Sequence, residues 1–419
     1  MVPRITLTLL AFLSLAIGQS SRVTAISGAR VISTPGRPAE SATIVIRDGK
    51  IVSVGKVIPK DATVIRLSGK TIIPGLVNAH GHMGAQGAAA SSQPSVEQQL
   101  ALYGRYGVTT VWSLGGENED AVQARAAQDS AKLRRARIYF AGPVIAARTP
   151  QEARQQVNKV SQMKPDVIKI RIDDQLGTQP KMTPEVYKAV IDEAHKLGFR
   201  VAVHIFYLDD AKGALRAGAD FIAHSVRDRD IDDEFLSLMK ARNICYCPTF
   251  TRELSTYAYE STPAFFKDPF FLQGADPTQV KQLQEPDRQK AMRESKSAQT
   301  YKAAVPLAMK NLKRVADAGI RIAMGTDTGA GPGRFQGYFE HLEMEMMTQA
   351  GLTPAQVLKA STVDAAACMG RADVGSIEPG KWADLIVLNA NPLDDIRNTR
   401  KIHNVWIAGN PLETGKPLR

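Results

Sequence analysis

Eight short apolar stretches, each followed by a segment with helical patterning, fill the middle of this chain and restrict the folds open to it. The candidate strands lie at 75–80, 107–113, 137–142, 166–172, 200–205, 220–224, 243–249 and 320–326. Strands that alternate with helices indicate βα units and a parallel sheet. Eight such units over about 300 residues match the size of a (β/α)8 TIM barrel, so we expect an α/β fold of that type. A doubly wound open sheet is the alternative, and periodicity alone does not distinguish the two.

The helix expected after the fourth strand shows the quality of this pattern. Thr183 is a favourable N-cap, Pro184 suits the first turn, and Gly198 suits the end of the helix. Apolar side chains recur along it at helical spacing and predict one buried face. These residues are Val186, Val190, Ala194 and Leu197.

Both ends of the chain have β character. Alternating apolar residues on either side of Asp48-Gly49 predict a hairpin, and similar strands recur after residue 375. Neither end holds enough strands to form a stable sheet alone. We therefore expect one small composite β-sandwich domain, formed by 21–72 and 375–419, with the barrel over 73–374.

A long gap separates the seventh and eighth candidate strands. It spans roughly seventy residues, well beyond ordinary loop lengths. Segment 251–310 within it is rich in aromatic residues, which are Tyr257, Tyr259, Phe265, Phe266, Phe270, Phe271 and Tyr301. Such an insertion is typical of a lid over a binding site, or of a surface that packs against a neighbouring subunit. A homo-oligomer is therefore left open.

The N-terminus has the pattern of an export signal. Arg4 precedes the apolar run 5–17, which is short for a membrane-spanning helix, and small residues suit cleavage before Ser21. We expect a signal peptide over 1–20, a periplasmic or secreted protein, and no stable membrane insertion after cleavage. The three cysteines, Cys245, Cys247 and Cys368, give no disulfide framework, and free buried thiols are expected.

The net charge is +11, from 53 Lys and Arg against 42 Asp and Glu. A basic chain can indicate a nucleic-acid or anionic-membrane partner. Here the charges are scattered and form no Lys/Arg-rich run of the nucleic-acid-binding kind. We expect a small-molecule substrate and no nucleic-acid partner.

Candidate metal ligands end four of the predicted strands. His80 and His82 alternate on one face of the first strand, and the others end the fifth, sixth and eighth strands. The others are His204, His224 and Asp327. Active sites of TIM barrels lie at this end of the strands. Imidazoles with a carboxylate are the usual ligands of zinc and similar divalent metals, so the pattern predicts a metal site.

Lys169 interrupts the apolar fourth strand. Burying a lysine is costly unless the side chain is paired or neutral. One interpretation is an ion pair inside the barrel, for example with Asp327. The other is a modified lysine directed at a metal.

Together these residues resemble those of the amidohydrolase superfamily, in its imidazolonepropionase-like and prolidase-like branch. The segments PGLVNAHGH at 74–82 and GSIEPGKWADL at 375–385 are similar to that family's first-strand motif and to its return into the β domain. The ligand order His-x-His, Lys, His, His, Asp is complete, and the resemblance covers nearly the whole mature chain. It implies an N6-carboxylysine at Lys169 that bridges two divalent ions, most simply zinc. His80, His82 and Asp327 would bind the more buried ion, and His204 and His224 the other.

The resemblance implies hydrolysis of an amide C–N bond by a metal-activated hydroxide, with a dipeptide or N-acyl amino acid as substrate. Asp327 would be the catalytic base and proton shuttle. Arg171, on the same strand face as Lys169, is the first candidate for a substrate carboxylate. Further candidates for substrate contacts are Tyr207, Arg227 and His341. A lactonase or phosphotriesterase with the same centre, or a non-catalytic exported binding protein, are the alternatives.

Overall fold

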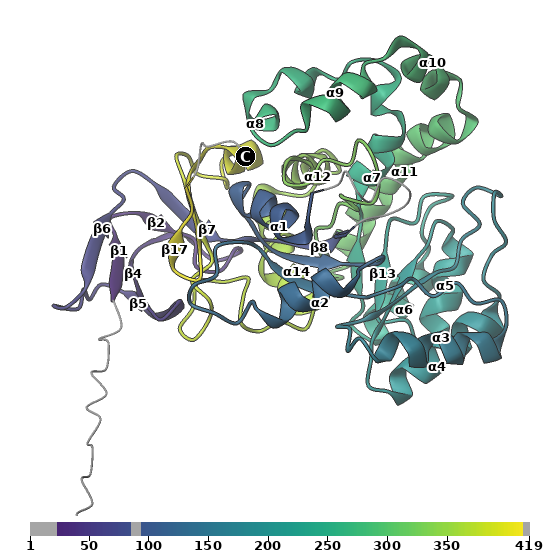
Figure 1. The fold of residues 1–419 in the computed structure, drawn as a ribbon, viewed down its shortest axis with the longest axis horizontal. Helices are drawn as coiled ribbons and strands as arrows, with labels where there is room; N and C mark the ends of the chain where they lie inside the picture. Colours follow the sequence, from purple (N-terminus) through teal and green to yellow (C-terminus); the bar gives the residue numbers. More distant parts are fainter. Residues whose placement is uncertain (1–22, 85–93, 414–419) are drawn as a thin grey trace, which may run out of the picture.

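The computed structural model describes residues 23–84 and 94–413. The predicted signal peptide lies outside these residues. Helices and strands mix throughout in an α/β architecture, and none of the helices in the described part is long and apolar enough to span a bilayer. In Figure 1 the strands of the two chain ends lie side by side at one flank, whereas α3 to α6 lie at the other.

The strands at the two ends of the chain form two sheets, in the orders β5-β4-β1-β6 and β17-β16-β15-β7-β2-β3. Their bounds are β1 Thr24–Ser27, β2 Arg30–Val31, β3 Glu40–Ser41, β4 Thr43–Arg47, β5 Lys50–Gly55, β6 Thr63–Arg66, β7 Thr71–Pro74, β15 Leu385–Leu388, β16 Ile402–Ile407 and β17 Asn410–Pro411. The hairpin between β4 and β5 turns at Asp48 and Gly49, which both have left-handed backbone, at φ 51° and 78°.

The second of these sheets joins distant parts of the chain. Strand β15 pairs antiparallel with β7, so that Leu385 lies opposite Pro74 and Leu388 opposite Thr71. Between the sheets lies one apolar core with members from both ends of the sequence, among them Ile26, Ile44, Ile72, Val387 and Trp406. Neither end could bury these side chains by itself.

Seven of the predicted barrel strands are present as parallel strands, in the sheet orders β10-β9-β8 and β11-β12-β13-β14. Their bounds are β8 Leu76–Gly81, β9 Val108–Ser113, β10 Arg137–Phe140, β11 Ile168–Arg171, β12 Val201–His204, β13 Phe221–Ala223 and β14 Cys245–Cys247. An isolated parallel bridge joins Ile145, in the segment after β10, to Ile170 of β11. Every residue of β8, β9, β10, β12, β13 and β14 is buried, as expected for strands covered on both faces.

The segment predicted as the eighth strand differs from the expectation, because it forms no regular strand. Isolated parallel bridges connect Ile322 to Tyr246 and Thr328 to Gly81. Between these bridges the chain passes through Asp327, whose backbone is left-handed with φ 60°. That conformation interrupts the extended ladder and turns the carboxylate away from the strand direction.

The helices that follow the strands cover the parallel sheets. Their bounds are α1 Val96–Arg105, α2 Glu119–Ala126, α3 Pro150–Ser161, α4 Pro184–Lys196, α5 Leu208–Ala217, α6 Asp233–Ala241, α12 Tyr338–Gln349, α13 Pro354–Ala360, α14 Val363–Cys368 and the 3₁₀ turn η4 Ile396–Arg400. The expected face of α4 is buried at Val186, Val190 and Ala194. Leu197 is a correction: it follows the helix as its C-cap and is 38% exposed.

The aromatic segment between the seventh and eighth strands is helical. It contains α7 Phe250–Tyr257, η2 Ala258–Glu260, η3 Ala264–Lys267, α8 Pro269–Leu272, α9 Pro277–Leu283, α10 Pro286–Glu294 and α11 Lys296–Asp317. Figure 1 shows α8 to α10 as an arc set apart from α3 to α6. Several of its aromatic rings are buried within the same chain, in a cluster of Tyr106, Tyr259, Phe266, Phe271, Leu283, Phe335, Tyr338 and Phe339. We call this set the aromatic cluster.

The prediction of three free thiols is wrong. Cys245, at the start of β14, forms a disulfide with Cys368, at the end of α14, across 123 residues of sequence. Cys247 is the buried free thiol. The spacing of the cysteines could not reveal this pair, because the fold brings together residues that the sequence holds far apart.

We expect unfolded, unreduced protein to show one titratable thiol per chain, against three after reduction. Replacing Cys245 and Cys368 together by serine should lower the free energy of unfolding by about 2–5 kcal/mol, since the cross-link restricts a long loop in the unfolded chain. Urea denaturation of the variant, and of the wild type with and without reductant, measures this loss. Three thiols before reduction would contradict the pairing.

Candidate functional site

Five of the six predicted metal ligands line one cavity of about 520 Å³, at the carboxyl ends of the parallel strands, and His224 is not among its lining residues. His80, His82, Lys169, His204 and Asp327 are among the residues that line it. His80, Lys169 and His204 belong to β8, β11 and β12, His82 directly follows β8, and Asp327 lies between the two isolated bridges. Alternation along a strand directs every second side chain to the same side. The sequence positions spread over nearly 250 residues therefore converge on one space.

His80, His82 and Asp327 form the tightest group. Their ligand atoms lie within 4.8 Å of one another, and all three side chains are buried. Oδ1 of Asp327 is 3.1 Å from Nε2 of His80 and 2.8 Å from Nε2 of His82. The other ring nitrogen of His82, Nδ1, lies 2.8 Å from the carbonyl oxygen of Gly115, which orients the ring. Two imidazole nitrogens and a carboxylate oxygen that converge in this way fit a divalent metal ion.

His204 and His224 lie beside this group. The ring centroid of His224 is 4.0 Å from that of His204 and 4.5 Å from that of His80. Nδ1 of His224 is 2.6 Å from Oγ1 of Thr249, whereas its Nε2 is buried without a partner among the described residues. An orphaned imidazole nitrogen next to other ligands is suited to coordination.

Burial keeps these imidazoles neutral. Desolvation lowers the pKa of His204 to about 4, against the raising effect of Asp173, and it lowers the pKa of His224 well below the usual range. The pKa of His80 is also lowered, first by burial and then by the charge of Lys169. Neutral imidazole is the form that binds metals, so the environment favours coordination.

Lys169 lies next to His80, and its charge also lowers the pKa values of His204 and His224. Its side chain is buried, and Nζ is 3.3 Å from Nε2 of His80. Desolvation lowers its pKa to about 8. The alternative of an ion pair with Asp327 is not seen: among the residues described, no carboxylate lies within 4 Å of Nζ. The buried amine therefore contacts the imidazole of His80 and not a carboxylate.

Asp327 has both carboxylate oxygens engaged. Oδ1 faces the histidines, and Oδ2 accepts a hydrogen bond from Nη1 of Arg334, which also lines the cavity. Burial alone would raise the pKa of Asp327, but the guanidinium of Arg334 and the hydrogen bonds from His80 and His82 outweigh it and hold the pKa well below its usual range. Asp327 is therefore ionised although it is buried, with 5% of its surface exposed.

Asp173 is a site residue that the sequence interpretation missed. Its Oδ2 is 2.8 Å from Nε2 of His204, and both side chains are buried. Metal-binding histidines are usually oriented by such a carboxylate on the second ring nitrogen. A signal was available, because strand alternation from Lys169 through Arg171 places residue 173 on the same side of the chain.

Glu340 is a second missed residue, and it fixes the two ligand-bearing segments to each other. Its buried Oε1 accepts hydrogen bonds from Nδ2 of Asn78 at 2.7 Å and from the hydroxyls of Thr326 and Thr328, each at 2.7 Å. Asn78 lies two residues before His80, and the two threonines flank Asp327. One carboxylate thus ties β8 to the turn that carries Asp327.

Glu117 and Glu343 also fix backbone segments, in their case segments that orient other predicted metal ligands. Glu117 accepts from the backbone N–H of Gly115, whose carbonyl orients His82. Glu343 accepts from the backbone N–H groups of Phe250 and Thr251, next to Thr249, and burial raises its pKa to about 8. Sequence alone could not assign these roles, because they depend on which helix or loop packs behind each ligand.

Left-handed backbone occurs at several of these positions. His224 has φ 74°, and Thr249, which bonds to its ring, has φ 53°. Such conformations are uncommon outside glycine and concentrate at functional sites, where surrounding structure holds them in place. The ligand directions are therefore set by the backbone as well as by the side-chain rotamers.

Two of the four residues predicted to contact the substrate, Arg171 and Tyr207, are partly exposed. Arg171 lines the cavity, and it makes no ion pair with any described residue. Tyr207 is half-buried, but its hydroxyl donates to Oδ1 of Asp174 at 2.9 Å, and the residue is not among those that line the cavity.

The other two are corrections. Arg227 is fully buried, pairs with Glu253 at 3.1 Å, and does not line the cavity. His341 is also buried, with Nδ1 2.9 Å from Oγ1 of Thr399 and Nε2 2.8 Å from the carbonyl oxygen of Tyr106. Both ring nitrogens are therefore used in packing α12. Proximity to the site along the sequence was misleading in both cases.

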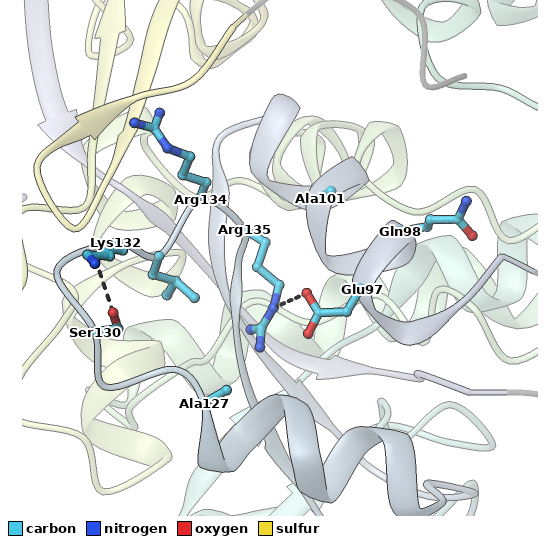
Figure 2. Close-up of a pocket in the computed structure, with 9 residues that line it drawn as sticks. Glu97, Gln98, Ala101, Ala127, Ser130, Lys132, Arg134 and Arg135 are labelled. Carbon is cyan, nitrogen blue, oxygen red and sulfur yellow. Dashed lines mark hydrogen bonds and ion pairs between the residues drawn. The ribbon is translucent and has the colours of Figure 1, made fainter.

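Volume alone does not identify the site, because a second hollow of about 520 Å³ lies between α1 and segment 127–135 (Figure 2). Its charged groups include an ion pair of Arg135 with Glu97, at 2.5 Å, in which Glu97 is exposed. Its described lining residues contain no histidine and no cysteine. The cavity at the strand ends is distinguished by its chemistry.

Comparisons with known proteins agree with this arrangement. The Amidohydrolase family model matches residues 71–412 of the chain. Ochratoxinase of Aspergillus niger is 24% identical over 284 residues, which cover 65% of this chain and 51% of that protein. Imidazolonepropionase of Deinococcus deserti is 35% identical over 101 residues, which cover 23% of this chain and 25% of that enzyme. The chain thus spans about half the length of ochratoxinase, and less of the second relative.

Solved structures match over nearly the full chain. A putative prolidase from Bifidobacterium longum has a TM-score of 0.75 at 26% identity, and the match covers 95% of this chain and 96% of that one. A Xaa-Pro dipeptidase with methionine bound in its active site also has a TM-score of 0.75, at 24% identity, over 94% of this chain and 100% of that one. At that identity the second likeness shows a common fold.

Proposed function

The chain belongs to the amidohydrolase family, and on that premise we propose that it is a metal-dependent enzyme that hydrolyses an amide C–N bond. The observation that carries the proposal is the buried group of His80, His82 and Asp327 at the cavity, with ligand atoms within 4.8 Å of one another. Two imidazole nitrogens and one carboxylate oxygen that converge at a cavity are the ligands that zinc and similar divalent ions take.

The proposed centre holds two divalent ions, most simply zinc. His80, His82 and Asp327 would hold one ion, His204 and His224 the other, and Lys169, as N6-carboxylysine, would bridge them. The orphaned Nε2 of His224 supports this assignment. So does the lowered pKa of Lys169, because carboxylation requires the neutral amine. Ions in such a site polarise a carbonyl and make hydroxide available near neutral pH.

Asp327 is the proposed general base. Its position beside the histidines would let it accept a proton from the attacking water and donate that proton to the leaving nitrogen. Arg334 would keep the carboxylate ionised before the reaction and hold its direction during it. Glu340 would support the same geometry from behind, through Thr326 and Thr328.

A dipeptide or an N-acyl amino acid is the proposed substrate. A cavity of about 520 Å³ suits a molecule of that size, and Arg171 offers an unpaired guanidinium for its carboxylate. The prolidase and the Xaa-Pro dipeptidase among the structural neighbours support an amide substrate.

We extend the proposal to the setting and the rest of the fold. A protein exported through a signal peptide over 1–20 would meet an oxidising compartment, and the pairing of Cys245 with Cys368 supports that location. The isolated bridges from Ile322 and Thr328 to neighbouring strands support closure of the parallel strands into a (β/α)8 barrel.

The test is to strip the metal, restore zinc, and assay one panel of dipeptides, N-acyl amino acids, lactones and phosphotriesters. We expect amide hydrolysis to disappear with the metal and to return with zinc. Turnover of lactones or phosphotriesters without turnover of any amide would overturn the reaction class. Metal binding without any turnover would indicate a binding protein instead.

A further inference from the structure

The cavity carries more positive charge than its carboxylate can compensate. Among its described lining residues, Arg171, Arg252 and Arg334 carry guanidinium groups, whereas Asp327 is the one carboxylate. Asp327 also faces His80 and His82. Enclosing unpaired guanidinium groups is costly unless a ligand supplies the opposite charge.

The positive charge of Arg252 is only partly neutralised by neighbouring carboxylates. Its Nη1 lies 2.9 Å from Oε1 of Glu253, but the same oxygen is 3.1 Å from Nη2 of the buried Arg227. One carboxylate therefore serves two guanidinium groups. Arg252 is further held over the ring of Tyr301, at 4.3 Å from the ring centroid.

Arg334 is fixed at two of its three nitrogens. Nη1 donates to Oδ2 of Asp327, and Nε donates to Oγ of Ser255 at 3.2 Å. No described residue accepts a hydrogen bond from Nη2. Because a guanidinium is planar, holding two nitrogens also sets the direction of the third.

The backbone on either side of Arg334 is anchored to the helical insertion. The hydroxyl of Tyr259 donates to the carbonyl oxygen of Gly333, and the N–H of Gly333 donates to Oε1 of Gln279 at 3.0 Å. Phe335 packs edge-on against Phe271, with ring centroids 4.8 Å apart, in the aromatic cluster. The insertion thus holds Arg334 at the cavity instead of leaving it on a free loop.

Arg171 provides a second cationic point at a different place. It belongs to the end of β11 and is near Lys169 and His204, whose pKa values its charge lowers. Arg334 follows Asp327 and is near Arg252. A ligand with one anionic group, bound by Arg171, would leave Nη2 of Arg334 without an acceptor among the described residues.

We propose that Arg334 is a second anion-binding residue, and that the preferred substrates are amides with two acidic groups, one for Arg171 and one for Arg334. This rests on the proposed function and names its substrate class. An acidic dipeptide or an N-acyl derivative of aspartate or glutamate has this chemistry. Arg334 would bind the second carboxylate through Nη2 while Nη1 holds Asp327.

The experiment compares dipeptides that carry Asp or Glu at either position with the matched Asn or Gln dipeptides. For the zinc-loaded wild type, we expect kcat/KM to be about 10- to 100-fold higher for one acidic series, the scale of a lost charged hydrogen bond. Arg334→Gln should abolish this preference. Arg334→Lys keeps a cation for Asp327 but lacks the second directed donor, so its kcat/KM should fall further for the acidic series than for the neutral series. Arg37→Gln is the charge-matched control, because Arg37 is an exposed residue between β2 and β3, and it should leave the preference unchanged.

Equal kcat/KM for acidic and neutral dipeptides in the wild type would overturn the proposal. So would an Arg334→Gln enzyme that loses both series by the same factor, since Arg334 would then only position Asp327. If no amide is hydrolysed at all, the proposed function fails, and calorimetry tests the subsite separately. Glutarate should then bind the wild type more tightly than butyrate does, and Arg334→Gln should remove the difference. Equal binding would reject it.

Discussion

Asp327→Asn is expected to retain most of its metal while turnover falls by a factor of about 10² or more, the usual loss for a general base. The asparagine keeps the size of the side chain and one oxygen toward His80 and His82, but it cannot accept a proton. The native carboxylate is held ionised by Arg334, so the lost function is proton transfer. Metal content and kcat measured on one preparation decide the outcome.

Asp317→Asn is the matched control, because Asp317 is a surface carboxylate paired with Lys313 on α11. It should leave both metal content and kcat unchanged. If Asp327→Asn instead loses metal, and excess zinc restores its rate, then Asp327 serves as a ligand alone.

Lys169→Ala is expected to lower turnover by at least the 10–100-fold that follows removal of a group organising a metal site. If Lys169 is carboxylated, then formate, acetate or propionate should enter the space left by the side chain and restore part of the rate. Lys196→Ala, at a surface position 72% exposed in its side chain, should show neither the loss nor the recovery. A crystal structure of active enzyme that shows a bare ammonium group at Lys169 would contradict carboxylation.

Strand periodicity was a reliable guide where both faces of a strand are buried. It predicted β8 to β14 within a few residues at each end and led to the family resemblance that the matches over 71–412 confirm. It overestimated the eighth strand: segment 320–326 makes an isolated bridge from Ile322 to Tyr246, and the backbone turns left-handed at Asp327, directly after the predicted strand. Such a conformation depends on tertiary contacts, which cannot be predicted from the neighbouring residues in the sequence.

The metal-binding side chains were easier to predict than the residues that orient them. His80, His82 and His204 could be placed because strand ends converge in this fold. Arg227 and His341 were misplaced, because a polar residue near a strand end can equally turn into the packing behind it. The disulfide and the glutamates behind the ligands depend on tertiary neighbours that no spacing reveals.

The sheet shared by the two chain ends has a consequence for the order of synthesis. Strand β7 ends at Pro74, and its partner β15 begins at Leu385. At about 5–20 residues per second, roughly 15–60 s pass before a ribosome delivers that partner. Until then Ile26, Ile44 and Ile72 lack the side chains of Val387 and Trp406 that cover them in the folded protein. The β domain is therefore the last part of the molecule to close, and a chain truncated before β15 leaves its first strands open to other chains.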